Sequence, residues 1–184
     1  LPLFVAARVI VNPTLALTQA AARTHHAPWL VANLHLDAPL LDRAGAPPSW
    51  DNVAYAPAGT SSALGYVDAT HQSLHPVREP PLLTAYHALP EAQRARLLSG
   101  SAGDWARLVV ADLAATLHPD LSRRVRQVDL MRHGHAMSIP VPGTRSDAAR
   151  TALRQARGRL RFAHADLAGY SVFEEAFEAG NGVA

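Results

Sequence analysis

Trp29-Leu30-Val31-Ala32-Asn33-Leu34-His35-Leu36 is the stretch of sequence that decides the fold. It is nearly continuously apolar at first, which is typical of a strand covered on both faces. Residues 37–50 follow with three prolines and a glycine, and this composition predicts a loop. The chain is therefore expected to build a sheet around residues 29–36.

Further strands are predicted on the C-terminal side of this stretch, separated by turns that contain Gly and Pro. They are residues 52–56, 64–70, 82–86 and 125–131. We expect an α+β (mixed α/β) fold in which helices pack on a mostly antiparallel sheet.

Helical segments are marked by their end signals. Residues 13–25 have helical composition, and Pro90 and Gly100 have the positions of a first helical residue and a stop. Ser101 and Asp104 have capping-box spacing and precede a helix that ends by Pro119. That helix has one apolar face, formed by Trp105, Leu108, Val109, Leu113 and Leu117.

Composition excludes several classes of function. The chain has 184 residues with 48% hydrophobic and 17% charged content, no Cys and a net charge of +2. Without Cys there is no disulfide, thiolate nucleophile or Cys-ligated zinc. Every basic residue is Arg, and the one tight cluster, residues 123–126, is expected to be a solvated segment. We expect no nucleic-acid partner and, without an apolar run of about 20 residues, no membrane span.

The last part of the chain combines three local signals. Residues 160–164 alternate as a strand does, and residues 166–170 have the composition of a turn. Ser171-Val172-Phe173-Glu174 has capping-box spacing and opens a helix through Ala179, closed by Gly180. A helix over residues 147–157, capped by Ser146 and stopped by Gly158, precedes them. A strand, turn and helix in this order present backbone N–H groups to an anion, and Asp166 can accept hydrogen bonds from sugar-like hydroxyls.

The last part of the sequence resembles the C-terminal signature of flavin-containing amine oxidases and their desaturase relatives. The matching residues are Leu160-Arg161-Phe162-Ala163-His164-Ala165-Asp166, then Gly169, then Phe173-Glu174-Glu175-Ala176-Phe177-Glu178-Ala179-Gly180. Four upstream segments are similar to bacterial FAD-dependent oxidoreductases: residues 27–34, 50–53, 64–72 and 134–137. The resemblance covers most of the chain.

The resemblance implies FAD as cofactor and assigns roles to named residues. Asp166 would bind the ribityl chain, and the helix that begins at Phe173 would supply its dipole. The residues that would pass along the flavin ring are Leu167, Ala168, Gly169, Tyr170, Ser171 and Val172. His133, His135 and Met137 would lie near the cavity of a small-molecule substrate. The reaction would be hydride transfer to the flavin from a C–H next to nitrogen or from a C–C bond. No catalytic residue is assigned.

The resemblance also implies a domain division. Residues 1–158 would be a substrate-domain-like region, and residues 159–184 the final strand and helix of an FAD-binding domain. The Gly-x-Gly-x-x-Gly fingerprint of that domain is missing from the sequence. We therefore expect a fragment, inert alone, whose partner is the N-terminal half. Residues 1–11 and the Phe173 and Phe177 side chains would expose apolar surface through which a homodimer could form.

Two alternatives stay open. The chain could be a self-standing module that binds a ligand or partner and never meets flavin. Leu130-Met131-Arg132-His133-Gly134 also looks like the nucleophile motif of histidine phosphatases, with His133 phosphorylated and Arg132 clamping the phosphate. The ten histidines lack a tight ligand spacing, and we expect no metal site.

Overall fold

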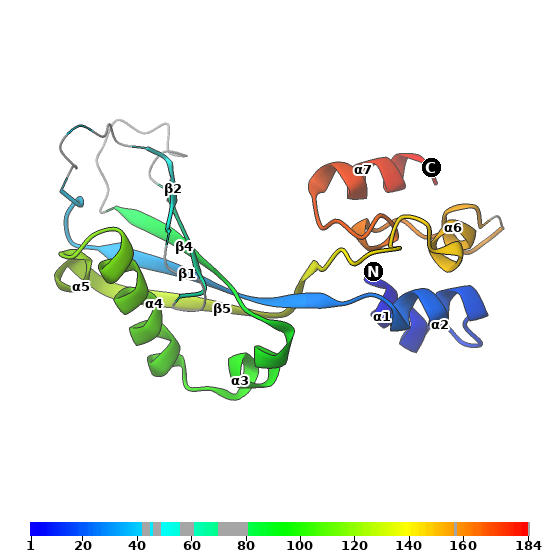
Figure 1. The fold of residues 1–184 in the computed structure, drawn as a ribbon, viewed down its shortest axis with the longest axis horizontal. Helices are drawn as coiled ribbons and strands as arrows, with labels where there is room; N and C mark the ends of the chain where they lie inside the picture. The colour runs from blue at the N-terminus through cyan, green and yellow to red at the C-terminus, as the bar shows by residue number, and fades with distance from the viewer. Residues whose placement is uncertain (42–44, 46–48, 56–60, 70–80, 157, 184) are drawn as a thin grey trace. The chain divides into compact units, whose positions relative to one another are not determined.

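The computed structural model describes residues 1–41, 45, 49–55, 61–69, 81–156 and 158–183 (Figure 1). The chain divides into two compact units. The first combines Leu1–Ala27 with His135–Ala184, and the second is Pro28–Gly134. The boundary predicted between residues 158 and 159 lies inside the first unit.

The second unit is built on a sheet of five strands in the order β2-β3-β4-β1-β5. The strands are β1 (His26–Leu36), β2 (Asp51–Val53), β3 (Ala63–Asp68), β4 (Leu82–Ala88) and β5 (Val125–Ser138). β1 pairs antiparallel with β4, and β3 pairs antiparallel with both β2 and β4. The expected α+β fold with a mostly antiparallel sheet is confirmed.

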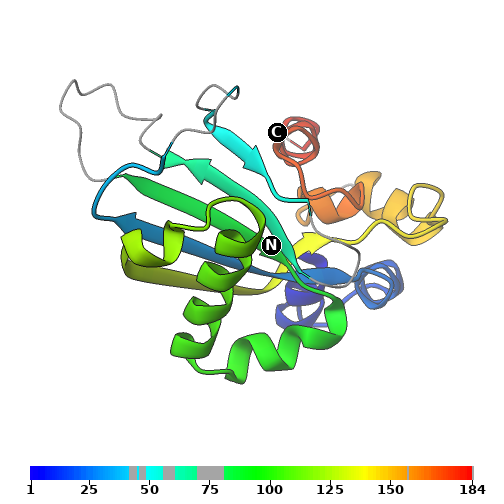
Figure 2. The same cartoon turned by 60° about the vertical axis from the view of Figure 1, so that its left-hand side comes forward.

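Three helices cover one face of this sheet. They are α3 (Arg94–Ser99), α4 (Ala102–Thr116) and α5 (Leu121–Arg124), and they lie on one side of the strands (Figure 2). Ser101 caps α4 as predicted, because its Oγ accepts the Asp104 N–H at 3.1 Å. Trp105, Val109 and Leu113 point from α4 into the core.

β1 is not covered on both faces, and this expectation was wrong. Its residues alternate between buried and half-buried along the whole strand. Leu30, Ala32, Leu34 and Leu36 are buried and join the core that α4 also forms. Trp29 and Val31 made the sequence look continuously apolar, but they lie on the opposite face, where the Trp29 ring contacts Tyr86 edge-on.

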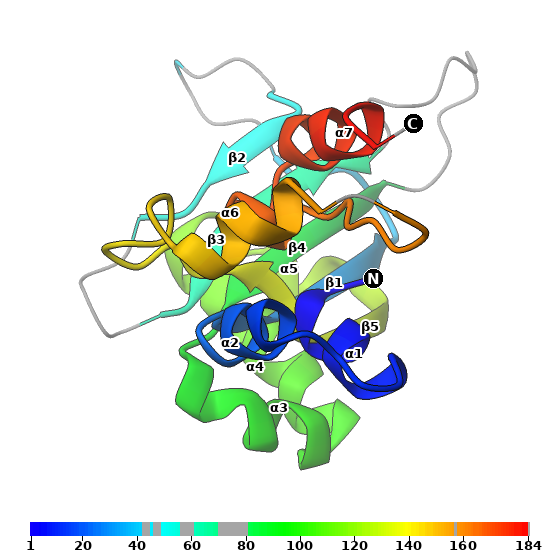
Figure 3. The same cartoon turned by 90° about the vertical axis from the view of Figure 1, so that its right-hand side faces the viewer.

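The first unit contains four short helices: α1 (Leu3–Val9), α2 (Leu15–Ala22), α6 (Ala148–Arg154) and α7 (Phe173–Asn181). A 3₁₀ turn, Ala165–Leu167, precedes α7. The apolar core of the unit joins both ends of the sequence (Figure 3). It consists of Leu3, Ala6, Leu17, Ala20, Ala149, Leu153 and Leu167.

Three expectations for the C-terminal part were wrong. Residues 160–164 form no strand; instead His164 begins the 3₁₀ turn, and its ring accepts the Asp166 N–H. Val172, not Ser171, precedes α7, and the Ser171 hydroxyl accepts the Ser138 N–H at 2.6 Å instead. Asp147 replaces Ser146 as the cap of α6, which ends at Arg154. A tertiary contact replaces the predicted cap at Ser171, whereas His164 and Asp147 make local hydrogen bonds other than the predicted ones.

Among the residues that the structure describes, no helix has the length and apolarity needed to cross a bilayer.

His87 on β4 is a polar group inside the core of the second unit. Its side chain is fully buried, and Nε2 lies 3.3 Å from Asp112 Oδ2. Within the described part of the chain, neither ring nitrogen has a hydrogen-bond partner. Burial lowers the pKa of His87 below its ordinary value, although the neighbouring Asp112 carboxylate opposes this effect. The ring is therefore neutral in the folded protein at neutral pH.

We predict that His87 makes the protein sensitive to mild acid. The unfolded chain binds a proton at the ordinary histidine pKa, about 6.5, whereas the folded chain binds it only at lower pH. Stability should therefore fall as pH decreases below about 6.5, by at most about 1.4 kcal/mol per pH unit for this group. Urea denaturation between about pH 5 and 8 measures the slope.

His87→Leu should flatten this slope by the contribution of one proton, and the exposed His133→Leu should not. Equal slopes in the wild type and His87→Leu would contradict the assignment.

Candidate functional site

Asp166 lies at the centre of the first unit and is completely buried. Its Oδ2 accepts the Leu3 N–H at 2.9 Å. Its Oδ1 accepts the Ser138 hydroxyl at 2.7 Å and lies 3.0 Å from His26 Nε2. The carboxylate thus joins the N-terminal helix α1, the first residue of β1 and the last residue of β5.

The Asp166 carboxylate is ionised in spite of its burial. Burial by itself raises the pKa of this group, but hydrogen bonds from His164, His26, Ser138 and the Leu3 backbone outweigh it and hold the pKa well below the ordinary range. In its neutral form, His164 accepts the Asp166 N–H through Nδ1 at 3.1 Å. When protonated, the same nitrogen can donate to Oδ2, 3.5 Å away.

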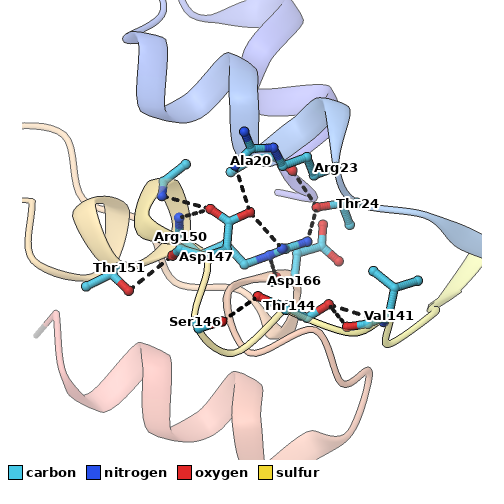
Figure 4. Close-up of polar contacts among 12 residues, drawn as sticks. Ala20, Arg23, Thr24, Val141, Thr144, Ser146, Asp147, Arg150, Thr151 and Asp166 are labelled. Atoms are coloured by element: carbon cyan, nitrogen blue, oxygen red, sulfur yellow. Dashed lines mark hydrogen bonds and ion pairs between the residues drawn. The ribbon is translucent and has the colours of Figure 1, made fainter.

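Arg150 on α6 extends this polar centre (Figure 4). Its guanidinium is buried and donates to the Asp166 carbonyl at 3.1 Å and to Thr24 Oγ1 at 2.8 Å. Asp147 Oδ2 lies 3.4 Å from Arg150 Nη1 and also 3.4 Å from Arg23 Nη1. The buried Arg150 guanidinium is not left alone in the core, because the two buried carboxylates of Asp147 and Asp166 both attract it.

These contacts bear directly on the role predicted for Asp166. A ribityl hydroxyl needs an accessible oxygen, whereas both Asp166 oxygens are buried and already bonded within the first unit. The carboxylate would have to exchange a partner to bind a sugar-like group. In the described structure the Asp166 carboxylate holds α1, the start of β1 and the end of β5 together.

The turn after Asp166 carries the other residues of the predicted flavin site. Leu167 is buried, whereas Tyr170, Val172 and Phe173 are exposed. Gly169 adopts φ +79°, and a Cβ there would lie 2.2 Å from Thr144 Cγ2, so both conformation and space require glycine. The turn is thereby held against Thr144.

α7 begins directly after this turn without a side-chain cap. Among the described residues no side chain caps its first N–H groups, and Glu174 and Glu175 place two carboxylates in the same first turn. Phe173 and Phe177 stack with ring centroids 5.7 Å apart, and both side chains are largely exposed. The expected apolar face of this helix is present.

A cavity of about 480 Å³ lies beside the same turn, within the first unit. Phe162, Leu167 and Ala168 are among its apolar lining residues. Its polar lining residues are Arg145, Arg154, His164, Tyr170, Glu175 and Glu178. The volume falls in the range of small-molecule sites.

The three predicted substrate-cavity residues lie along β5. His133 and His135 occupy alternate positions and are both exposed, so they share one face of the strand as expected. The His135 ring lies 4.6 Å from the Phe4 ring, measured between centroids. Met137 is half-buried. None of the three lines the cavity of the first unit.

The sheet of the second unit presents a face that α3, α4 and α5 leave uncovered. Trp29 and Tyr86 form an aromatic pair there, with centroids 6.3 Å apart. Asn33 Oδ1 accepts the Thr84 hydroxyl at 2.9 Å, and His35 lies 2.7 Å from Asp129. This face combines apolar rings with polar groups, as surfaces that bind small organic molecules do.

The phosphatase-like motif has a different use. Arg132 lies inside β5, and its guanidinium donates to the Gly100 carbonyl at 2.8 Å and more weakly to Leu97 and Leu98. A phosphate clamp needs a guanidinium that is free for bidentate contact. The geometry therefore favours a structural role, in which Arg132 ties α3 to β5.

The comparisons with known proteins give no family. No family model matches the chain, and no curated protein matches it. In the described residues, no cluster of His, Asp or Glu is arranged to hold a metal ion.

Sequence reasoning missed the partners of Asp166 and the buried Arg150. A signal for Arg150 was present, because it lies one turn before Leu153 and thus on the apolar face of α6. An arginine in such a position needs buried acceptors. His26, Ser138 and Leu3 gave no signal, since they lie far from Asp166 in the sequence.

We predict that Asp166→Asn destabilises the protein by about 3–5 kcal/mol, the cost of breaking a buried charged network. The amide NH2 must face either the Leu3 N–H or the Ser138 hydroxyl, which are both donors, and Arg150 loses one of the two carboxylates that attract it. Urea denaturation followed by far-UV circular dichroism measures the loss.

Asp104→Asn is the matched control, because Asp104 is exposed and its ion-pair partner among the described residues is Arg107 on α4. It should cost less than about 1 kcal/mol. If the two substitutions were equivalent, Asp166 would not be the centre of the unit.

Proposed function

We propose that this chain supplies the substrate-side region and the last flavin-facing turn and helix of an FAD-dependent oxidoreductase of the amine oxidase type. The observation that carries the proposal is the uncapped N-terminus of α7, which directly follows the turn bearing the signature residues. A bound flavin would accept a hydride at N5 from a C–H next to nitrogen or from a C–C bond.

The start of α7 suits an electron-rich ring edge. Reduced flavin carries negative charge around N1 and the C2 carbonyl, and a helix N-terminus stabilises such charge by about 0.3–1 kcal/mol. Tyr170 and Phe173 are exposed on either side of this position and offer apolar contact to a planar ring. Asp166 and Gly169 keep the turn in place.

The Asp166 carboxylate does not fit the ribityl role in its present contacts, and we derive no step from it. One helix end is far short of the roughly 8 kcal/mol that micromolar binding needs. The pyrophosphate and adenosine would bind a Gly-rich turn outside this sequence. We therefore expect this chain alone to bind FAD weakly or not at all.

The substrate side of the proposal draws on the uncovered sheet face of the second unit. Trp29 and Tyr86 supply aromatic surface, and the exposed His133 supplies a polar group on β5. An apolar small molecule could lie on these rings while a histidine orients its polar end.

The natural protein that contains this chain should purify with visible flavin absorbance. Val172→Asp should strongly lower its flavin content, because the new carboxylate caps α7 and places a negative charge where the flavin carbonyl would lie. The helix itself should be as stable as before or more stable.

Val141→Asp adds the same charge at another exposed position of the first unit and should leave the flavin content unchanged. A natural protein that is colourless and takes up no added FAD would refute the proposal. Equal flavin content in the natural protein, Val172→Asp and Val141→Asp would show that the start of α7 is not part of the flavin site.

A second candidate function is a self-standing module that binds a small molecule. The cavity of the first unit favours it, since this unit alone provides the whole lining. If the natural protein is colourless and binds a small molecule in this cavity, the self-standing module is the correct function.

A further inference from the structure

The cavity of the first unit carries an unusual set of charges. Arg145 and Arg154 line it together with Glu175 and Glu178. Arg154 is already engaged, because it donates to the Leu167 carbonyl at 2.6 Å and to Thr151 Oγ1 at 3.2 Å. The other three side chains make no ion pair or hydrogen bond with any residue that the structure describes.

Charges of both signs therefore line one cavity without neutralising each other. A ligand with a single charge would meet groups of both signs, one guanidinium and two carboxylates. A zwitterion can place its carboxylate at the guanidinium and its ammonium at the carboxylates, and both contacts are charge-assisted. A neutral ligand would form a charge-assisted pair with none of the three groups, of which Arg145 and Glu178 are exposed and Glu175 is half-buried.

The remaining lining residues fit an apolar ligand body with polar ends. Phe162 and Leu167 provide apolar contact. His164 uses Nδ1 to accept the Asp166 N–H, and with Nδ1 accepting, the ring proton is on Nε2, which can donate to a ligand. Tyr170 adds a hydroxyl that can donate or accept.

We propose that this cavity binds a small zwitterion with an apolar body. The ligand carboxylate would pair with Arg145, its ammonium with Glu175 and Glu178, and its apolar part would contact Phe162 and Leu167. This site does not depend on flavin, so it can be tested whether or not the proposed oxidoreductase function holds.

Three probes of one shape separate the contributions of charge. L-Phenylalanine carries both charges, 3-phenylpropionate only the carboxylate and 2-phenylethylamine only the ammonium. Isothermal titration of the wild-type chain should show L-phenylalanine binding at least about tenfold more tightly than either analogue, the size expected for one charge-assisted hydrogen bond.

Substitutions then locate the two ends of the ligand. Arg145→Gln should weaken L-phenylalanine by about tenfold and leave 2-phenylethylamine unaffected or tighter. The double variant Glu175→Gln/Glu178→Gln should also weaken L-phenylalanine binding. It should weaken 2-phenylethylamine binding and leave the affinity for 3-phenylpropionate unaffected or higher. Arg159→Gln and Glu174→Gln are controls, because both residues are exposed and neither lines the cavity.

The wild-type titration needs no variant and can overturn the proposal by itself. Absence of saturable L-phenylalanine binding at millimolar concentration would do so, as would equal affinity for the three probes. Control variants that weaken binding as much as Arg145→Gln would also overturn it.

Discussion

The first unit depends on one buried charge, the carboxylate of Asp166. Its partners come from opposite ends of the sequence: Leu3 on α1, His26 at the start of β1 and Ser138 at the end of β5. Removing an ion from water is expensive, and only a full set of hydrogen bonds compensates for it. The geometry of the N-terminal helix and of the turn before α7 is therefore set by the same group.

Much of the second unit could be predicted from local pattern. Strand positions followed from Gly- and Pro-bearing turns, and the α4 cap followed from the spacing of Ser101 and Asp104. These signals worked because the interactions behind them are local. The uncovered face of β1 was missed, since Trp29 and Val31 are apolar on either kind of surface.

The candidate site could be predicted less well, because its contacts join residues far apart in sequence. Residues 160–164 alternate like a strand but form none, and the Asp166 carboxylate that follows bonds Leu3, His26 and Ser138. Ser171 has the spacing of a cap, yet it bonds Ser138. The resemblance singled out Asp166, and the structure adds that this residue organises the turn from within.

The most direct test of this account is hydrogen exchange at a single amide. Leu3 is the first residue of α1, where an amide has no partner within the helix and would ordinarily exchange freely. Because its N–H donates to the buried Asp166 carboxylate at 2.9 Å, it should exchange far more slowly than an exposed amide. NMR measurement of exchange at Leu3 should show this protection, and its loss in a variant without the Asp166 carboxylate. Free exchange at Leu3 in the wild type would contradict the account.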